Sequence, residues 1–438
     1  MALLSSRGRG LQDFYPPYFE IFDDPWNPDT NPNGYLNLGV AENTLMQPEM
    51  KKYIDQNIDH DPRRMNYGDG FFGSKQLNSA ACKFLNKTFS PTTPLTSSHL
   101  IATAGVGNAL EACAWALCER DDYILIGRPY WGSFKFMFGA RAGVKIREVS
   151  FGSIDPFTLE AVSVYEKECE QARKEGKKVS ALLLCTPHNP TGRCYSRDVM
   201  EAYLAACQRL GIHLISDEIY ALCAWDNPKA PDTTRFTSVL SLNVEKFIDP
   251  SRVHVVWGTS KDFGVAGIRI GFLISQSNPE FLRSARSISL FNYPSSIADH
   301  VVAKLFGDEP FMEWYHAEHR ARLATSYQFA VDFMEAQDIP YIHTHAGLFL
   351  MINLGAKMFR GMTDDEIHQK LKAQKVYIYS GKTFTYEEPG WFRLVFAHPV
   401  ATLQEGFKRL LRASPQGKQK LPTTQLENLC IDENSCGQ

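Results

Sequence analysis

The chain has 438 residues, of which 44% are hydrophobic and 22% charged, and its 46 basic and 49 acidic residues leave a formal charge of -3. This composition is ordinary for a folded globular protein and excludes a disordered, collagen-like or coiled-coil chain. Because the charges nearly balance, we expect no polybasic surface for nucleic acid or for an anionic membrane, and the predicted partner is a small molecule.

The ten cysteines are scattered, without a Cys-x-x-Cys pair or the histidine spacing of a zinc site, so no metal is expected. Several lie in apolar runs, as is typical of buried reduced thiols. The start, MALLSSRGRGLQDF, has too short an apolar stretch for a signal peptide, and no later run approaches the roughly 18 apolar residues of a membrane span. These features predict a cytoplasmic protein without a membrane segment.

Residues 1–56 are rich in Pro and Asn and are predicted to form an N-terminal arm that belongs to a smaller domain. Residues 57–310 alternate short apolar runs with amphipathic stretches. The apolar runs, which predict strands, are 123–126, 181–185, 213–215 and 253–257; the predicted helices are 107–118 and 197–210. This alternation predicts an α/β fold with a mostly parallel sheet covered on both faces, and ligand-binding groups on the loops after the strands.

After about residue 310 the pattern changes to long helices and isolated strands, which predicts a smaller α+β domain over 311–413. Residues 312–336 are predicted to be a helix, and 347–354 and 391–397 to be strands. Thr363 and Glu366 have the spacing of a capping box that begins another helix. The polar tail, residues 414–438, is predicted to be mobile.

Three strand ends carry polar residues that packing does not explain. TPHNPTG follows ALLLC, SDEIY follows HLI, and TSKDFGVAGIRIG follows RVHVVW. Taken singly, Asp217 with Glu218 could be a solvated helix start, Asn189 with Pro190 a turn, and Lys261 a surface charge. Their joint order is far less expected by chance and indicates a chemical site at these strand ends.

Over residues 31–411 the chain resembles the fold-type I pyridoxal-phosphate enzymes of the class I/II aminotransferase family. Within that family it most resembles the 1-aminocyclopropane-1-carboxylate synthases, on the segments NPNGYLNLGVAEN, GIHLISDEIY, RVHVVWGTSKDFGVAGIRIGF, AGLF and EEPGWFRLVFA. The resemblance implies a large and a small domain, pyridoxal 5'-phosphate as cofactor, an amino acid substrate and a homodimer.

The resemblance also assigns roles around the cofactor ring. Lys261 matches the lysine that condenses with the cofactor aldehyde and later serves as base at the substrate α-carbon, tasks that suit an amine. Asp217 matches the carboxylate that keeps the pyridine nitrogen protonated. Tyr220 and Asn189 match the hydrogen-bond partners of the phenolic oxygen. Trp131, in RPYWGSF, matches the aromatic that stacks on the ring, with a purely structural core Trp as the alternative.

For the phosphate, the resemblance implies four contacts within one chain and one from a partner. Arg269 supplies a guanidinium fork, Val106 and Gly107 supply backbone N–H groups at a helix start, and Ser260 could add a hydroxyl. Tyr67, in MNYGDG, matches a tyrosine that reaches the phosphate and substrate across a dimer interface.

For the substrate, Arg393 in PGWFRLVF matches the arginine that binds the α-carboxylate through two parallel hydrogen bonds. An arginine inside an otherwise apolar strand is costly to bury unless it is paired, which favours this functional role. Ala41 and Glu42, in VAEN, match the segment that lies over the substrate.

The chain departs from the family pattern at three places. Gly258 stands where the family commonly has a serine that binds phosphate, so either phosphate affinity is lower or another group compensates. The loop 135–138 is more apolar than in the synthases, and the Thr-Gly at the end of TPHNPTG is more typical of aminotransferases.

Two reactions are therefore kept. The first is a lyase resembling 1-aminocyclopropane-1-carboxylate synthase, in which S-adenosylmethionine loses its α-proton to Lys261 and then releases methylthioadenosine. The alternative is an aminotransferase that passes the amino group to a 2-oxo acid, or an enzyme of secondary metabolism on an unusual substrate. A regulatory protein without turnover is disfavoured because Lys261 and Asp217 are both present.

Overall fold

The structure is a computed structural model that describes residues 3–12, 20–58, 61–231 and 233–415. The predicted mobile tail lies outside the described residues from residue 416 onward, as do Cys430 and Cys436. In the described ranges the eight cysteines are free thiols, and all except Cys118 are buried. No helix in those ranges is both long and apolar enough to cross a bilayer.

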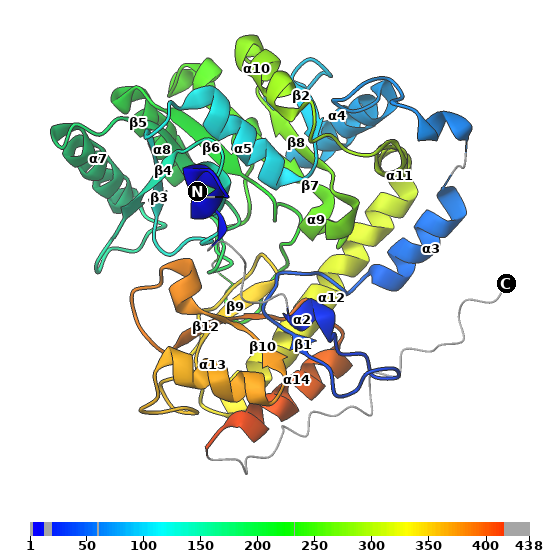
Figure 1. Cartoon of the computed structure of the whole chain (residues 1–438), viewed down its shortest axis with the longest axis vertical. Coiled ribbons are helices and arrows are strands. Elements are labelled where there is room, and N and C mark those ends of the chain that lie inside the picture. Colours follow the sequence, from blue (N-terminus) through cyan, green and yellow to red (C-terminus); the bar gives the residue numbers. More distant parts are fainter. Residues whose placement is uncertain (1–2, 13–19, 59–60, 232, 416–438) are drawn as a thin grey trace.

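A seven-stranded sheet forms the core of the larger part of the molecule (Figure 1), in the order β2-β8-β7-β6-β5-β3-β4. Its strands are β2 (Leu100–Thr103), β3 (Tyr123–Gly127), β4 (Lys145–Val149), β5 (Val179–Cys185), β6 (His213–Asp217), β7 (Val253–Gly258) and β8 (Gly271–Ile274). β8 is antiparallel to both neighbours, and all other neighbouring pairs are parallel. The predicted α/β class is confirmed, and the four predicted strands are β3, β5, β6 and β7.

Helices cover both faces of this sheet. They are α4 (Lys75–Phe89), α5 (Val106–Leu117), α6 (Phe134–Gly139), α7 (Leu159–Lys174), α8 (Arg197–Leu210), α9 (Thr259–Asp262), α10 (Pro279–Ser289) and α11 (Ser296–Gly307). Along the strand order, α5 and α6 each lead to a strand nearer the β4 edge, whereas α7 and α8 each lead to a strand nearer the β2 edge. Because such crossovers are right-handed, the two pairs lie on opposite faces. α8 has the predicted bounds, and Gly211 ends it in the left-handed conformation with φ 68°.

The smaller part contains a three-stranded antiparallel sheet, β11-β12-β9, and a parallel pair, β1 with β10. Its elements are β1 (Leu36–Asn37), β9 (Phe349–Asn353), β10 (Val376–Tyr377), β11 (Tyr379–Ser380), β12 (Trp391–Val395), α13 (Asp364–Ala373) and α14 (Val400–Ala413). The predicted capping box of Thr363 and Glu366 is present at the start of α13.

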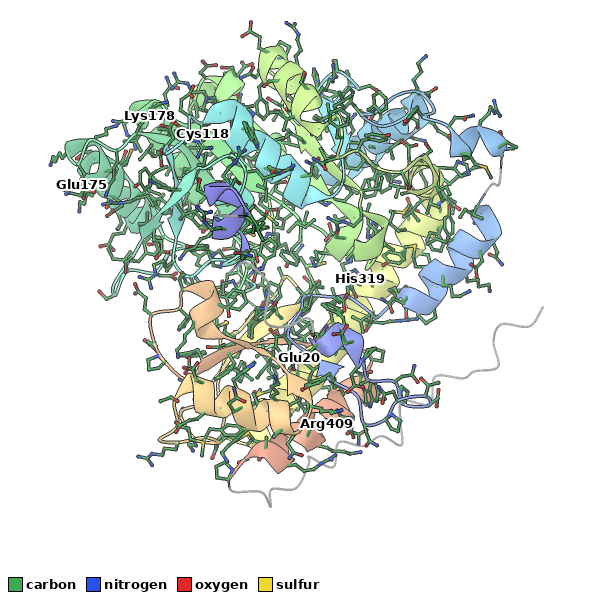
Figure 2. All side chains as sticks on the ribbon, in the orientation of Figure 1. Glu20, Cys118, Glu175, Lys178, His319 and Arg409 are labelled. Atoms are coloured by element: carbon green, nitrogen blue, oxygen red, sulfur yellow. The ribbon has the colours of Figure 1, made fainter. Side chains whose placement is uncertain are left out.

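The long helix α12 (Glu309–Ala336) runs from the larger part into the smaller one (Figure 1). The N-terminal segment carries α1 (Ser6–Gly10), α2 (Glu20–Asp23), β1 and α3 (Gln47–Asn57). Arg409 of α14, labelled in Figure 2, donates to the carbonyls of Pro32 and Gly34 at 2.7 and 2.6 Å and thereby ties this segment to the smaller part. α3, in contrast, packs on α11 of the larger part. The division at residues 56 and 310 stays a prediction.

Short 3-10 helices join these elements: η2 (Pro62–Met65), η3 (Val239–Ser241), η4 (Val244–Lys246), η5 (Pro250–Arg252), η6 (Ala266–Ile268) and η7 (Gly381–Phe384).

Candidate active site

The loops that follow β2, β3, β5, β6 and β7 meet strand β12 at one cavity of about 200 Å³. Ligand groups gather at the carboxyl ends of parallel strands because the connecting loops lie there together. The predicted site residues that line this cavity are Ala41, Val106, Gly107, Trp131, Asn189, Asp217, Tyr220, Ser260, Lys261, Arg269 and Arg393. Tyr67 and Glu42 are not among its lining residues.

Lys261 projects from the short helix α9, directly after β7. Its Nζ donates to the carbonyl of Ala41 at 2.5 Å. Burial lowers the pKa of Lys261 to about 8, and the positive charge of Arg393 acts in the same direction, while Glu42 opposes it. A lysine in this state supplies neutral amine near neutral pH, which is what a nucleophile or a base requires.

Asp217 is the last residue of β6 and is buried in the cavity wall. One of its oxygens accepts a hydrogen bond from the Ile219 N–H at 3.2 Å. No lysine, arginine or histidine of the described residues forms an ion pair with it. Burial raises the pKa of Asp217 to about 7, although the Ile219 hydrogen bond and the charge of Lys261 lower it. This carboxylate would gain from a cationic partner inside the cavity.

The absence of such a partner predicts how Asp217 affects stability. Its folded pKa of about 7 lies above the ordinary value of 3.8. The folded protein therefore binds this proton more tightly than the unfolded protein does. The resulting contribution to the free energy of unfolding is complete below the pKa of the unfolded state, and it is lost as the pH rises through about 7. At pH 8, Asp217→Asn should therefore stabilise the cofactor-free protein by on the order of 1 to 4 kcal/mol, measured by urea unfolding.

Glu218 offers a matched control for this prediction. It is the adjacent buried acid, but its carboxylate accepts hydrogen bonds from Ser216 Oγ, Ser238 Oγ and the Val239 N–H at 3.0, 2.6 and 2.9 Å. Burial raises the pKa of Glu218 to about 7 as well, but Glu218→Gln should give a smaller gain than Asp217→Asn, because the amide cannot accept all the hydrogen bonds that stabilise the carboxylate. An Asp217→Asn variant that is less stable than the wild type at pH 8 would contradict the argument.

Two further polar side chains, Asn189 and Tyr220, line the cavity together with Asp217 and Lys261. Asn189, in the loop after β5, accepts a hydrogen bond through Oδ1 from Arg393 at 2.8 Å. Tyr220, three residues after Asp217, is buried with its ring edge-on to Phe349 at 5.2 Å. Burial raises the pKa of Tyr220, so its hydroxyl stays protonated and able to donate.

Trp131 lies in the loop after β3 and borders the same cavity. Its ring is half-buried and packs edge-on against Phe134 at 5.4 Å. An indole that leaves one side open to a cavity is placed to stack on a flat ring. The alternative of a fully enclosed core tryptophan is thereby disfavoured.

Arg269 and the first turn of α5 together form a cationic recess, here called the cup. The first turn of α5, at Val106 and Gly107, has N–H groups without intrahelical acceptors. Arg269 has a left-handed backbone, with φ 61°, and donates to the carbonyls of Ala104 and Ala266 at 3.1 and 2.9 Å. No carboxylate of the described residues pairs with it. A guanidinium and free amides at a helix start form a site for a phosphate.

Gly105 makes this cup possible. Its φ is +81°, and a Cβ there would collide with the guanidinium of Arg269. Gly258 is equally constrained, because a Cβ would lie 2.8 Å from the Ile270 carbonyl oxygen and 3.1 Å from Val106 Cγ2. A serine therefore does not fit at position 258, and the phosphate contacts must come from Arg269, Ser260 and the α5 amides.

Arg393, on β12, is 1% exposed and faces the cavity. Besides Asn189 it donates to the carbonyl of Gly39 at 2.6 Å, and its Nε has no hydrogen-bond partner. Within the described ranges no carboxylate forms an ion pair with it. Because an unpaired buried charge is costly, this guanidinium is prepared for an anion that enters the cavity.

The two remaining predicted residues lie elsewhere. Glu42 is half-buried, and its carboxylate accepts from Asn37 Nδ2 at 3.3 Å. Tyr67 is 69% exposed and packs against Phe71 and Tyr293, beside a separate surface hollow. The single chain does not bring Tyr67 to Lys261, so its predicted role depends on a second chain.

Sequence reasoning missed several residues of the wall. The apolar ones are Val40, Leu110, Phe134, Met137 and Ile219, joined by Cys185, Ala266 and Tyr379. Residues 135–138, predicted as a loop, instead lie in helix α6, and Met137 of that helix would have its Cε 3.1 Å from a Cβ at Gly107. The departure of residues 135–138 from the synthase pattern is the one sequence signal that could have placed Met137 here.

The fold and this site define a pyridoxal-phosphate-dependent enzyme of the aminotransferase type. Residues 33–410 match the family described as "Aminotransferase class I and II", and the chain belongs to this family. Members of the family use pyridoxal phosphate, which is the cofactor of this protein.

Named relatives fall into two groups. Mouse "1-aminocyclopropane-1-carboxylate synthase-like protein 1" is 31% identical, over 93% of this chain and 82% of its own. Mouse "Probable inactive 1-aminocyclopropane-1-carboxylate synthase-like protein 2" is 30% identical, over 95% and 72%. "Probable aminotransferase gliI" of Aspergillus fumigatus is 32% identical, over 86% and 88%.

Among solved structures, a mutant aspartate aminotransferase from Thermus thermophilus has a TM-score of 0.69 and 18% identity, covering 94% of this chain and 100% of its own. An aromatic aminotransferase from Pyrococcus horikoshii also has a TM-score of 0.69, with 21% identity, covering 86% and 94%. At these identities the likeness shows the fold alone.

The cavity residues fit the cofactor of the family. Asp217 suits the protonated pyridine nitrogen. Arg269 with the amides of Val106 and Gly107 suits the phosphate, and the amine of Lys261 suits the aldehyde. Among the described residues, none of these three side chains forms an ion pair, so the fit rests on the protein's own geometry.

Proposed function

We propose that this protein acts at the α-carbon of an α-amino acid, with Lys261 as the base. The observation that carries the proposal is Arg393, a buried guanidinium that lines the same cavity as Lys261 and Asp217 and forms no ion pair with a carboxylate in the part of the chain that the structure describes. A substrate carboxylate would supply the missing anion through two parallel hydrogen bonds.

When bound, the cofactor supplies an aldehyde for the amine and an electron sink for the α-carbon. Lys261 removes the α-proton, and burial keeps its amine partly neutral for this purpose. Arg393 fixes the carboxylate and so orients the α-carbon, while Trp131 closes one side of the cavity. Asp217, on the cavity wall, would hold the pyridine nitrogen of the cofactor in its protonated form.

The first candidate outcome is a lyase resembling 1-aminocyclopropane-1-carboxylate synthase. S-adenosylmethionine would lose its α-proton to Lys261, and the electron pair left on the α-carbon would displace methylthioadenosine from the γ-carbon. The likeness to the two mouse synthase-like proteins supports this outcome. Trp131 and Tyr379 line the cavity, and contact of their aromatic rings with the positive sulfonium would favour its binding.

The second candidate outcome is amino-group transfer, in which the proton is returned to another carbon and the amino acid leaves as a 2-oxo acid. Two observations favour it. The likeness to the fungal "Probable aminotransferase gliI" is of similar strength. Among the described residues, Asp217 is the one acidic side chain on the cavity wall, beside the basic Lys261, Arg269 and Arg393, so an uncharged substrate side chain fits better than a positive sulfonium.

One incubation separates the two outcomes. Purified protein with S-adenosylmethionine alone should release methylthioadenosine if the lyase reaction operates, without a 2-oxo acid. With leucine and 2-oxoglutarate it should form glutamate and the keto acid if transfer operates. Turnover that depends strictly on a 2-oxo acid, with no methylthioadenosine, would leave the transferase as the function. If no product forms in either mixture, the proposal is contradicted.

We also propose a homodimer in which Tyr67 of one chain serves the other chain's site. Exposed apolar side chains lie within two positions in the sequence of Tyr67 or of residues that line the same hollow: Met65 is 83%, Phe291 89% and Ile297 54% exposed. Such a patch is typical of an interaction surface. In a twofold dimer the two sites are equivalent, and each draws residues from both chains.

The dimer makes a complementation prediction. Lys261→Ala mixed with an impaired Tyr67→Ala variant should form hybrids in which one site has lost both residues and the other retains both. Activity should return to roughly a quarter of the wild-type value if chains exchange at random. Differently tagged chains and co-purification establish that hybrids form. Hybrids as inactive as their parents would show that Tyr67 serves its own chain or is structural.

A further inference from the structure

Residues 381–387, here called the strap, leave the smaller part of the molecule and return to it. The strap begins after β11 and contains η7 (Gly381–Phe384). The residues on either side of the strap are fixed to α13 by one side chain. Asp364 of that helix accepts hydrogen bonds from Ser380 Oγ at 3.0 Å and from the Gly390 N–H at 2.7 Å. Between these anchors the strap extends toward the loop that carries Trp131.

The strap contacts that loop, residues 128–132, through backbone and side chains. The Tyr130 N–H donates to the Phe384 carbonyl at 2.9 Å. Arg128 Nε donates to the Thr385 carbonyl at 3.1 Å, and its Nη1 lies 3.3 Å from a Glu387 oxygen. At Gly132 the approach is so close that a Cβ would collide with the Thr383 carbonyl oxygen. The position of the Trp131 loop therefore depends on the strap.

The same strap also holds the arginine of the carboxylate site. The ring of Phe384 is fully buried, and its centroid lies 4.5 Å from the guanidinium carbon of Arg393. Tyr379, the register partner of Arg393 across β11 and β12, packs edge-on against Phe384 at 5.8 Å. One residue, Phe384, thus contacts Arg393 with its ring and the Trp131 loop with its carbonyl.

The residue after Phe384, Thr385, has a strained backbone conformation. Thr385 is β-branched and adopts the left-handed conformation, with φ 55° and ψ 29°. Its buried Oγ1 has no hydrogen-bond partner. A β-branched residue keeps this conformation only where its surroundings impose it, and such strain gathers at functional sites. The carbonyl of Thr385 is the acceptor for Arg128, so the strain lies at the contact between the two parts.

We propose that Phe384 and Thr385 are positioning residues that couple carboxylate binding at Arg393 to the placement of Trp131. The proposal rests on the proposed function, because it needs a substrate carboxylate at Arg393. A bound carboxylate fixes the guanidinium, the guanidinium holds the Phe384 ring, and the Phe384 carbonyl holds the Tyr130 N–H. The indole is thereby held against the cavity when a substrate is present, and less firmly when it is absent.

Hydrogen exchange of the full-length, cofactor-loaded protein tests this coupling. The probe is 4-methylpentanoate, a carboxylate that lacks the amino group and cannot react. At saturation it should slow exchange in the peptide 128–134 about fivefold or more. This measurement needs no variant, and it reads protection of the Tyr130 amide instead of activity.

A matched pair of glycine variants tests whether the coupling passes through the contact between the strap and the Trp131 loop. Gly132→Ala forces the loop away from Thr383, whereas Gly139→Ala places its Cβ 3.6 Å from the nearest atom, the Val144 carbonyl oxygen. The analogue should slow exchange in the wild type and in Gly139→Ala, but not in Gly132→Ala. The Gly132→Ala variant should also bind both the analogue and the cofactor about tenfold more weakly.

Two results would overturn the proposal, and they are distinguishable. If the analogue binds in an Arg393-dependent manner while exchange in 128–134 stays unchanged, the coupling is absent and the proposed function stands. If Arg393→Leu binds the analogue as tightly as the wild type, Arg393 is not the carboxylate site, and both the proposed function and the coupling fail.

Discussion

Replacement of Lys261 by alanine should lower turnover at least about 10³-fold without unfolding the protein, because alanine supplies neither a nucleophile nor a base. Burial and the neighbouring Arg393 lower the pKa of Lys261 to about 8. At pH 8 roughly half of these side chains are therefore neutral amines, against under about 1% for an ordinary lysine. This reactive fraction is what the variant loses.

Borohydride reduction followed by peptide mass spectrometry provides the measurement. In the wild type the cofactor should become fixed to the peptide that contains Lys261, and in the variant that peptide should stay unmodified. Lys229→Ala is the control, because Lys229 is also partly buried but pairs with Glu335 at 2.7 Å, away from the cavity. It should keep wild-type turnover. A Lys261→Ala variant with wild-type turnover would refute the assignment.

The central strands could be predicted from sequence because their burial makes them continuous apolar runs. β5 and β7 are buried along their whole length, and β3 and β6 are buried except at their first residue. Among the strands that were not predicted, β4 lacks this signal, because it lies at the sheet edge with one buried residue. β2 and β8 are fully buried, but each has four residues, and their antiparallel pairing places them outside the alternation of parallel strands and helices.

The same distinction applies to the site. Asp217 ends a buried strand, and Asn189 and Lys261 come shortly after buried strands, so the sequence alone indicates their common location. Tyr379 reaches the cavity because it pairs with Arg393 in a register set by the connection between β11 and β12. The Gly39 carbonyl is a backbone acceptor, which leaves no side-chain signal. Such contacts depend on tertiary packing.

Arg393→Leu should weaken the binding of a substrate carboxylate by one to three orders of magnitude, since a desolvated charge pair contributes about 2 to 5 kcal/mol. The stability of the substrate-free protein should change little, because removing an unpaired buried charge offsets the loss of the donor to Asn189 Oδ1 and to the Gly39 carbonyl. Arg393 has no carboxylate partner among the described residues, and burial already lowers its pKa. A leucine would instead lie among the rings of Phe349, Tyr379 and Phe384. Titration with 4-methylpentanoate, followed by the absorbance of the bound cofactor, and thermal unfolding measure the two effects.

Arg409→Leu is the matched control, since Arg409 is the other arginine of the smaller part that is buried among the described residues. Its guanidinium pairs with Glu405 at 2.8 Å and donates to the carbonyls of Pro32 and Gly34. Its loss leaves these acceptors without a donor and should destabilise the protein by about 3 to 5 kcal/mol, with analogue affinity unchanged in the folded fraction. The two variants should therefore show opposite patterns: lost affinity with retained stability for Arg393, and lost stability with retained affinity for Arg409. If Arg393→Leu instead lost cofactor while keeping analogue affinity, Arg393 would belong to the cofactor site.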